Sequence, residues 1–194
     1  MSSFVSTELF GGAIVVDLPA GFGDASSIRQ VPDNQEVYLD ANGLTSIIFD
    51  ILERVDESTA ATDQDALKYH FHDIASGTND TTRFWHFGSA TLTKLPNTPA
   101  YVLFATQEPS RDAPQRGPQP DFTGILLTLV RLAKEKTDIV IAVNVPHVPG
   151  EYRPEDVDLP AQKLSPHLEA ATAARQKILE TFEIKDWSLF VNEE

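Results

Sequence analysis

Cysteine is absent from the 194-residue chain, and its absence excludes several kinds of chemistry at once. Disulfides, zinc–thiolate sites, thiol redox chemistry and cysteine nucleophiles all need the missing side chain. The sequence also lacks any apolar run of the roughly 20 residues that a membrane-spanning helix requires. Residues 1–7 contain no basic stretch followed by an apolar one, so we expect no signal peptide and no membrane association.

Basic residues are few relative to acidic ones. The sequence contains 15 lysines and arginines against 29 aspartates and glutamates, which gives a formal net charge of −14. A surface of that sign repels phosphate backbones, so we expect no nucleic-acid partner. The same negative field speeds encounter with a basic protein partner. A need for solubility alone would also explain the excess of acidic residues. With 41% hydrophobic residues and no internal repeat, residues 1–194 are expected to fold as one domain.

The motifs that mark common enzymes and ligand sites are also missing. The glycines are too few and wrongly placed for a loop that cradles phosphate. Ser89 lacks the flanking glycine and the following helix of a nucleophile elbow. His70 and His72 would share a face if they lay on a strand, but no third metal ligand follows at a useful spacing. We therefore expect no cofactor, no metal site and no bond-making or bond-breaking chemistry.

Segments rich in β-branched and aromatic residues predict a sheet. The run at Asp138–Val145 is apolar on both alternating faces, so it is expected to be a central strand with helices on both sides. A short polar link joins it to Gly124–Leu132, which predicts an antiparallel hairpin. Further strands are expected at Leu9–Leu18 (with a bend at Gly11 and Gly12), Glu36–Leu39, Thr82–Leu92 and Ala100–Thr106. The predicted fold class is α/β, in the mixed α+β sense.

Two helices and two loops complete the pattern. Ser165 followed by Pro166 is a helix start signal, and apolar residues recur after it at three- and four-residue spacing. Residues 65–74 are a second helical candidate. Proline clusters predict long loops at residues 108–121 and 146–160, because proline lacks the donor that a helix or ladder interior needs.

The sequence TSIIFDILERVDE, residues 45–57, is the main candidate for function. Its apolar residues gather on one side of a helical projection, so the segment is predicted to be a helix. Asp50, Glu53 and Glu57 then share the opposite side as an acidic stripe, with Phe49 beside it. An exposed aromatic residue flanked by charge is a common composition of a binding hot spot. A solvated helix face with Phe49 covered by a neighbouring loop would give the same pattern.

The segment before it combines a short helix, a turn and a strand. Asp24 is expected to cap a short helix that runs to Arg29. Asp33 lies in the turn sequence Pro-Asp-Asn, and Glu36 enters the strand that follows. Taken by themselves, these residues predict local structure and no particular activity.

Motifs along most of the chain resemble the Ran guanine nucleotide release factor family. Asp50 and Glu53 match two acids, three residues apart, that the family carries after its N-terminal signature. The order and spacing of the shared motifs also match, and these motifs are FGGAI at 10–14, DAS at 24–26, VPDNQEV at 31–37, TDIVI at 137–141 and WSLF at 187–190. The two proline-rich loops have no firm counterpart in the family pattern.

The resemblance implies a roughly six-stranded, mostly antiparallel sheet with helices on both faces. It implies that the chain binds the small GTPase Ran and promotes release of its bound guanine nucleotide, in support of nucleocytoplasmic transport. The expected location is the nucleus and the cytoplasm, the expected state is a monomer, and other Ran-binding proteins are candidate partners in a ternary complex. The predicted Ran-binding residues are Asp50 and Glu53, their signature neighbours Asp24, Arg29, Asp33 and Glu36, and Phe49 and Glu57 of the acidic segment.

Two other functions fit the same sequence. The chain could be a passive protein-binding adaptor that uses the acidic surface without any effect on nucleotide exchange. It could also be a small-molecule-binding module, which would require a large apolar pocket between the sheet and the helices. The rate of nucleotide loss from Ran separates the release factor from the adaptor.

Overall fold

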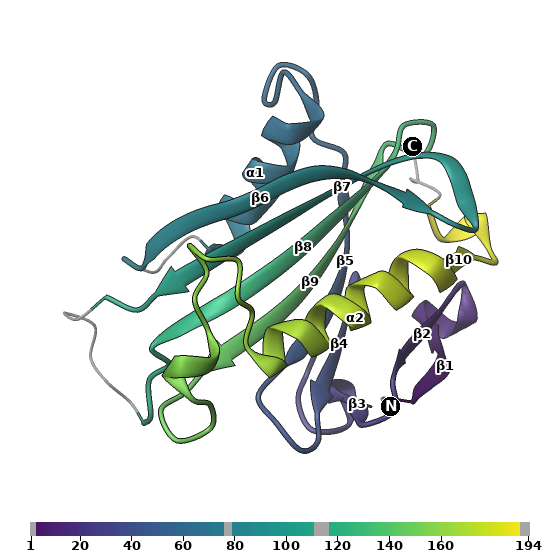
Figure 1. Ribbon diagram of the computed structural model, residues 1–194. Coiled ribbons are helices and arrows are strands. Elements are labelled where there is room, and N and C mark those ends of the chain that lie inside the picture. Colours follow the sequence, from purple (N-terminus) through teal and green to yellow (C-terminus); the bar gives the residue numbers. More distant parts are fainter. Residues whose placement is uncertain (1–2, 76–78, 111–116, 191–194) are drawn as a thin grey trace.

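The computed structural model describes residues 3–75, 79–110 and 117–190. In this part of the chain the helices α1 (Asp63–Ala75) and α2 (Pro166–Thr181) pack on a large antiparallel sheet (Figure 1). No helix among these residues is long and apolar enough to span a membrane. The seven strands of the sheet are β3 (Phe22–Asp24), β4 (Gln35–Asp40), β5 (Ser46–Glu53), β6 (Thr81–Leu92), β7 (Leu95–Glu108), β8 (Phe122–Leu132) and β9 (Thr137–His147).

The sheet has the strand order β3-β4-β5-β9-β8-β7-β6, and every neighbouring pair is antiparallel. It therefore has seven strands where roughly six were expected. The predicted hairpin of β8 and β9 is confirmed, and these two strands lie in the middle of the order. The strands predicted at Glu36–Leu39, Thr82–Leu92 and Ala100–Thr106 are confirmed as parts of β4, β6 and β7.

A second, three-stranded sheet combines two N-terminal strands with a short strand near residue 184. It contains β1 (Phe4–Leu9), β2 (Ile14–Pro19) and the short β10 (Glu183–Ile184). The single bent strand predicted at Leu9–Leu18 is wrong, because the chain reverses between β1 and β2. Gly11 and Gly12 have φ angles of 68° and 90° in this turn, a region that glycine adopts without strain.

The two alternating sides of β9 belong to different clusters of the core. Side chains on one side pack with α2, and those on the other side pack with α1. We call the corresponding sides of the sheet the α2 face and the α1 face. On β9 the α2 face carries Ile139, Ile141, Val143 and Val145, and the α1 face carries Val140 and Ala142.

Both helices begin at capped residues. The Ser165 hydroxyl accepts a hydrogen bond from the backbone N–H of Leu168 at 3.2 Å, and Pro166 occupies the first helical position, as predicted. Thr62 accepts in the same way from the N–H of Asp65 at 3.1 Å at the start of α1. The helical candidate at residues 65–74 is therefore confirmed as part of α1.

His147 anchors the proline-rich segment that follows β9. This last residue of β9 is fully buried, so the loop predicted from residue 146 starts later than expected. Its Nε2 lies 2.7 Å from the Ser165 hydroxyl, and its ring stacks on Phe122 with centroids 4.0 Å apart. Burial lowers the pKa of His147 to about 4, so the ring is neutral at pH 7. Of the loop predicted at residues 108–121, residues 111–116 lie outside the described part of the chain.

Candidate functional site: the β4–β5 end of the sheet

Residues 46–53 form the strand β5, so the helix predicted at residues 45–57 is wrong. Ile47, Ile48 and Ile51 are β-branched, a side-chain type that fits a pleated surface. β5 pairs with β4 on one edge and β9 on the other, and apolar side chains project from both of its sides. Such a run also clusters on a helical projection, so periodicity alone does not separate the two structures.

Asp50 and Glu53 do not share a face. Successive side chains of a strand alternate, so residues three apart project from opposite faces. Asp50 lies on the α1 face, opposite Gln35 of β4, whereas Glu53 is the exposed last residue of β5. Glu57 lies beyond the strand in an exposed turn. The predicted acidic stripe of three residues is therefore wrong, because it depended on helical spacing.

Asp50 is half-buried and keeps a hydrogen bond. Its Oδ1 accepts from Nε2 of Gln35 at 2.8 Å. Burial raises the pKa of Asp50 above its usual value, and the nearby Asp73 raises it too, whereas Gln35 and His70 act in the opposite direction. The ionised carboxylate is thus less favourable here than in water, and a cationic group of a partner would relieve that cost.

Asp33 and Glu53 lie at the same end of the β4–β5 pair. The backbone N–H of Ile51 donates to the carbonyl of Asn34 at 2.9 Å, and the Asn34 side chain donates back to the carbonyl of Ile51 at 3.1 Å. These bonds hold the turn before β4 against the last residues of β5. Asp33 and Glu53 are both exposed beside this contact. The structure thus places these two predicted residues at one end of the β4–β5 pair, and Asp50 lies on the α1 face of the same strand as Glu53.

Glu36 makes a structural contact on the α2 face. Its Oε1 accepts a hydrogen bond from the backbone N–H of Phe10 at 2.7 Å, which ties the β1–β2 turn to the large sheet. Tyr38 lies on the same face of β4, and Asp24 is its partner on β3. Burial raises the pKa of Tyr38 to about 12, with Glu36 and Asp24 adding to the effect. Asp24 also caps the short 3-10 helix Ala25–Ser27 by accepting from the backbone N–H of Ser26 at 2.8 Å. Its predicted capping role is confirmed, but the helix ends before Arg29.

Phe49 is fully buried on the α2 face, so its predicted role as an exposed hot spot is wrong. It belongs to the same core cluster as residues of α2 and β9. Ile28 is instead the strongly exposed apolar side chain of this region, with 75% of its surface accessible, and Arg29 beside it is exposed as well. The sequence carried a signal for Ile28, because it is a single large apolar residue among polar neighbours before the Asp33 turn.

A buried ionic network lies beneath α1. Asp138 accepts hydrogen bonds from His70 Nε2 at 2.8 Å and from Arg131 Nε at 3.0 Å, and Arg131 donates further to Asp63 at 2.7 Å. Both histidines lie on α1, where His70 faces the sheet and His72 is exposed, so they do not share a face. Among the described residues, no group of three or more histidine and acidic side chains is arranged to hold a metal ion.

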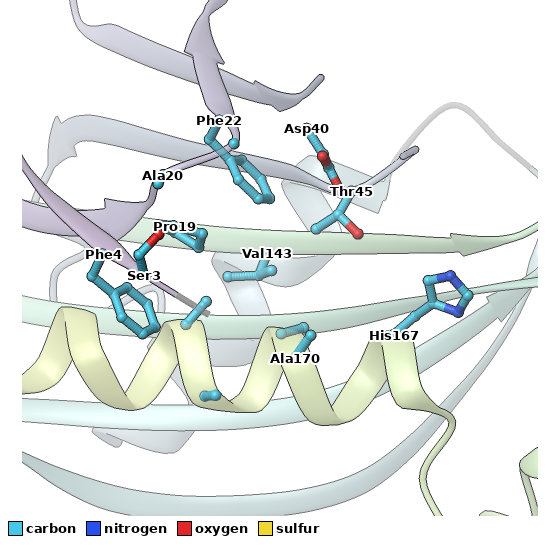
Figure 2. Close-up of a pocket in the computed structure, with 14 residues that line it drawn as sticks. Ser3, Phe4, Pro19, Ala20, Phe22, Asp40, Thr45, Val143, His167 and Ala170 are labelled. Atoms are coloured by element: carbon cyan, nitrogen blue, oxygen red, sulfur yellow. The ribbon is translucent and has the colours of Figure 1, made fainter. Parts of the chain in front are cut away.

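A groove with a volume of about 390 Å³ lies between α2 and residues of the strands β1, β2, β3, β4 and β9. Figure 2 shows Phe4 and Pro19 toward one end and the polar Asp40 and His167 toward the other. The volume is within the range of small-molecule sites, which is the feature that the small-molecule alternative requires. None of the eight predicted Ran-binding residues lines this groove.

Comparison with known proteins places the chain in a family. The family model described as Ran-interacting Mog1 protein matches residues 7–146. The chain belongs to the Ran-interacting Mog1 family. The Mog1 match includes β2 to β8, nearly all of β9, and α1, and so covers all eight predicted site residues and the network beneath α1.

Named Mog1 relatives match along nearly the whole chain. A protein of Dictyostelium discoideum named probable ran guanine nucleotide release factor is 31% identical over 98% of both chains. The Saccharomyces cerevisiae nuclear import protein MOG1 is 31% identical over 94% of this chain and 83% of its own. The crystal structure of the Saccharomyces cerevisiae Ran-binding protein Mog1p superposes with a TM-score of 0.75 at 28% identity, covering 98% of this chain and 100% of that one.

Proposed function

We propose that this Mog1-family chain binds the small GTPase Ran and promotes release of its bound guanine nucleotide, in support of protein import into the nucleus. The observation that carries the proposal is the similarity, over 94–98% of this chain, to proteins named as a Ran guanine nucleotide release factor and as a nuclear import protein. The binding surface we propose is the β4–β5 end of the sheet, with Asp50 and Glu53 at its centre and Asp33 beside them. We include the exposed residues Arg29 and Glu57 in this surface. The chain acts in both the nucleus and the cytoplasm.

The electrostatics of this end support a role in binding. Burial raises the pKa of Asp50 by making its ionised form less favourable, and the acidic residues Glu53 and Asp33 are exposed nearby. The chain as a whole carries a formal charge of −14, which accelerates encounter with a basic surface. A carboxylate that desolvation already disfavours gains more from a cationic partner than a fully solvated one does.

Release of nucleotide needs no bond chemistry in this chain. The protein needs to bind nucleotide-poor Ran more tightly than loaded Ran, and linkage then weakens nucleotide on Ran by the same factor. A thousandfold weakening requires about 4 kcal/mol of differential contact. Carboxylates can supply it by pairing with basic residues that otherwise face the phosphates, or by disturbing the magnesium ion that holds them. The groups that this chain offers for either route are the acids of β5.

The test follows the loss of a fluorescent guanine nucleotide from Ran. The test variant is Asp50→Ala with Glu53→Ala, and the control is Glu151→Ala with Glu169→Ala, two exposed acids elsewhere that change the net charge equally. We expect wild type and the control to accelerate nucleotide loss and the test variant to lose most of that effect. Equal acceleration by a folded test variant would move the site away from β5.

The adaptor alternative differs in one measurement. An adaptor would bind Ran in a pull-down and leave the rate of nucleotide loss unchanged. Absence of both binding and acceleration with wild type would contradict the proposed function as a whole.

A further inference from the structure

The segment between β5 and α1, residues 54–62, is held at its start by side chains of β8 and β9. The backbone N–H of Val55 donates to Asp138 Oδ2 at 3.1 Å, and the carbonyl of Val55 accepts from Arg131 Nη2 at 2.5 Å. Both polar groups of this backbone unit are therefore bound by the same ion pair. Val55 follows Glu53 by two residues, so the contact fixes the direction in which the chain leaves the proposed binding surface.

The same ion pair holds α1. His70 Nε2 lies 2.8 Å from Asp138 Oδ2, and because an ionised carboxylate only accepts, this nitrogen carries the proton. At the start of the helix Asp63 accepts from Arg131 Nη1 at 2.7 Å and from the Tyr101 hydroxyl at 2.5 Å. Asp63 at the start of α1 therefore bonds to Arg131, and His70, two turns later, bonds to Asp138.

The pair itself is a fixed part of the sheet. Arg131 and Asp138 are direct cross-strand partners on β8 and β9, with exposed fractions of 5% and 0%. Burial by itself would raise the pKa of Asp138, but hydrogen bonds from His70, Val55 and Arg131 outweigh it and hold the pKa below its usual range. The carboxylate is therefore charged at neutral pH with its donors in place.

A charge pair of this kind is a poor way to stabilise a core. Apolar residues of similar volume in the same place are often neutral or stabilising, because two charges need not then be desolvated. What apolar residues cannot do is bind a backbone N–H and a carbonyl at defined positions. The Arg131–Asp138 pair does both for Val55 while also bonding two side chains of α1, which points to placement of these segments as its role.

We propose that Arg131, Asp138 and His70 are positioning residues for the proposed binding surface at the β4–β5 end of the sheet. They act by fixing residues 54–62 and α1 relative to β5. This inference rests on the proposed function. The residues do not touch the partner themselves. They hold the chain where it leaves β5 beside Glu53, and they hold α1, whose residues His70 and Asp73 both influence the pKa of Asp50.

The main test replaces the pair by apolar residues. In the variant Arg131→Met with Asp138→Leu, we expect a folded protein whose Ran affinity falls by about tenfold or more. Hydrogen exchange of the Val55 amide should accelerate by a similar factor or more, because its acceptor is gone. The matched control is Ser165→Ala, which removes the cap of α2 and should leave both the Val55 exchange rate and Ran affinity within about twofold of wild type.

A second variant covers the case in which the apolar pair fails to fold. His70→Leu keeps Arg131, Asp138 and the bond from Arg131 to Asp63, and it removes only the hydrogen bond between His70 and Asp138. We expect it to weaken Ran binding by about fivefold. Wild-type Ran affinity in both test variants, when they are folded, would overturn the inference and leave a purely structural network. If wild type itself does not bind Ran, the proposed function fails, and Val55 exchange still decides whether the pair fixes this segment.

Discussion

Asp50 and Glu53 lie three residues apart on one strand and project from its opposite faces. Asp50 is bonded to Gln35 on the α1 face, while Glu53 ends the strand in solvent. The two carboxylates therefore meet different groups of a partner. We expect their effects on Ran binding to be additive within about 0.5 kcal/mol in a double-mutant cycle of the two alanine variants. Strong coupling would mean that one partner group contacts both acids, which this arrangement disfavours.

Asp50 should lower the free energy of unfolding while it contributes to Ran binding. Its pKa is raised in the folded protein by burial and by Asp73, so the ionised form is less favourable in the folded chain than in the unfolded chain at neutral pH. We expect Asp50→Asn to raise the free energy of unfolding by up to about 1 kcal/mol at pH 7 while it weakens Ran binding. Urea unfolding measures the first effect. Glu57→Gln, an exposed control, should change stability by less than about 0.5 kcal/mol.

Phe49 should matter for stability rather than for recognition. Its ring is fully buried on the α2 face of β5. We expect Phe49→Ala to lower the free energy of unfolding by about 3–5 kcal/mol, through lost burial and the cavity left behind. Chemical denaturation at neutral pH checks this. A variant that is as stable as wild type but does not bind Ran would restore the hot-spot interpretation.

The stability of the protein should fall in mild acid partly through His147. The pKa of this ring is about 4 in the folded chain and about 6.5 when unfolded, so between these values the unfolded chain binds the proton and the folded chain does not. Its contribution is complete above about pH 6.5 and is lost as the pH falls toward 4. We expect His147→Gln to flatten the dependence of the unfolding midpoint on pH in this window. An unchanged slope would assign the dependence to other groups.

Local signals predicted much of the fold. The Ser165 cap with Pro166, the β8–β9 hairpin and the capping role of Asp24 all follow from bonds between residues close in sequence. The failures have a common cause. Periodicity assigned residues 45–57 to a helix, but pairing with β4 and β9 makes residues 46–53 a strand. The predicted orientations of Phe49 and of the acidic residues were therefore wrong together.

The residues of the candidate site were predictable from the sequence, but their arrangement in space was not. The motif resemblance selected Asp50 and Glu53 by residue type and spacing, which are the same whether the backbone is a helix or a strand. The contact between Asp50 and Gln35 needed the register of β4 on β5. The network of His70, Arg131 and Asp138 joins residues up to 68 positions apart, and no local pattern carries such a bond.

The net acidic charge, the absence of thiol chemistry, the helix caps and the motifs shared with the Mog1 family can all be read from the amino-acid sequence. These properties depend on residue types and on neighbours within a few positions. Contacts between distant segments make β5 an interior strand, bury Phe49 in the core, and bind the segment that leaves β5 to Arg131 and Asp138. Strand pairing and burial depend on residues far apart in the sequence, and their energies outweigh local preference once the sheet has formed.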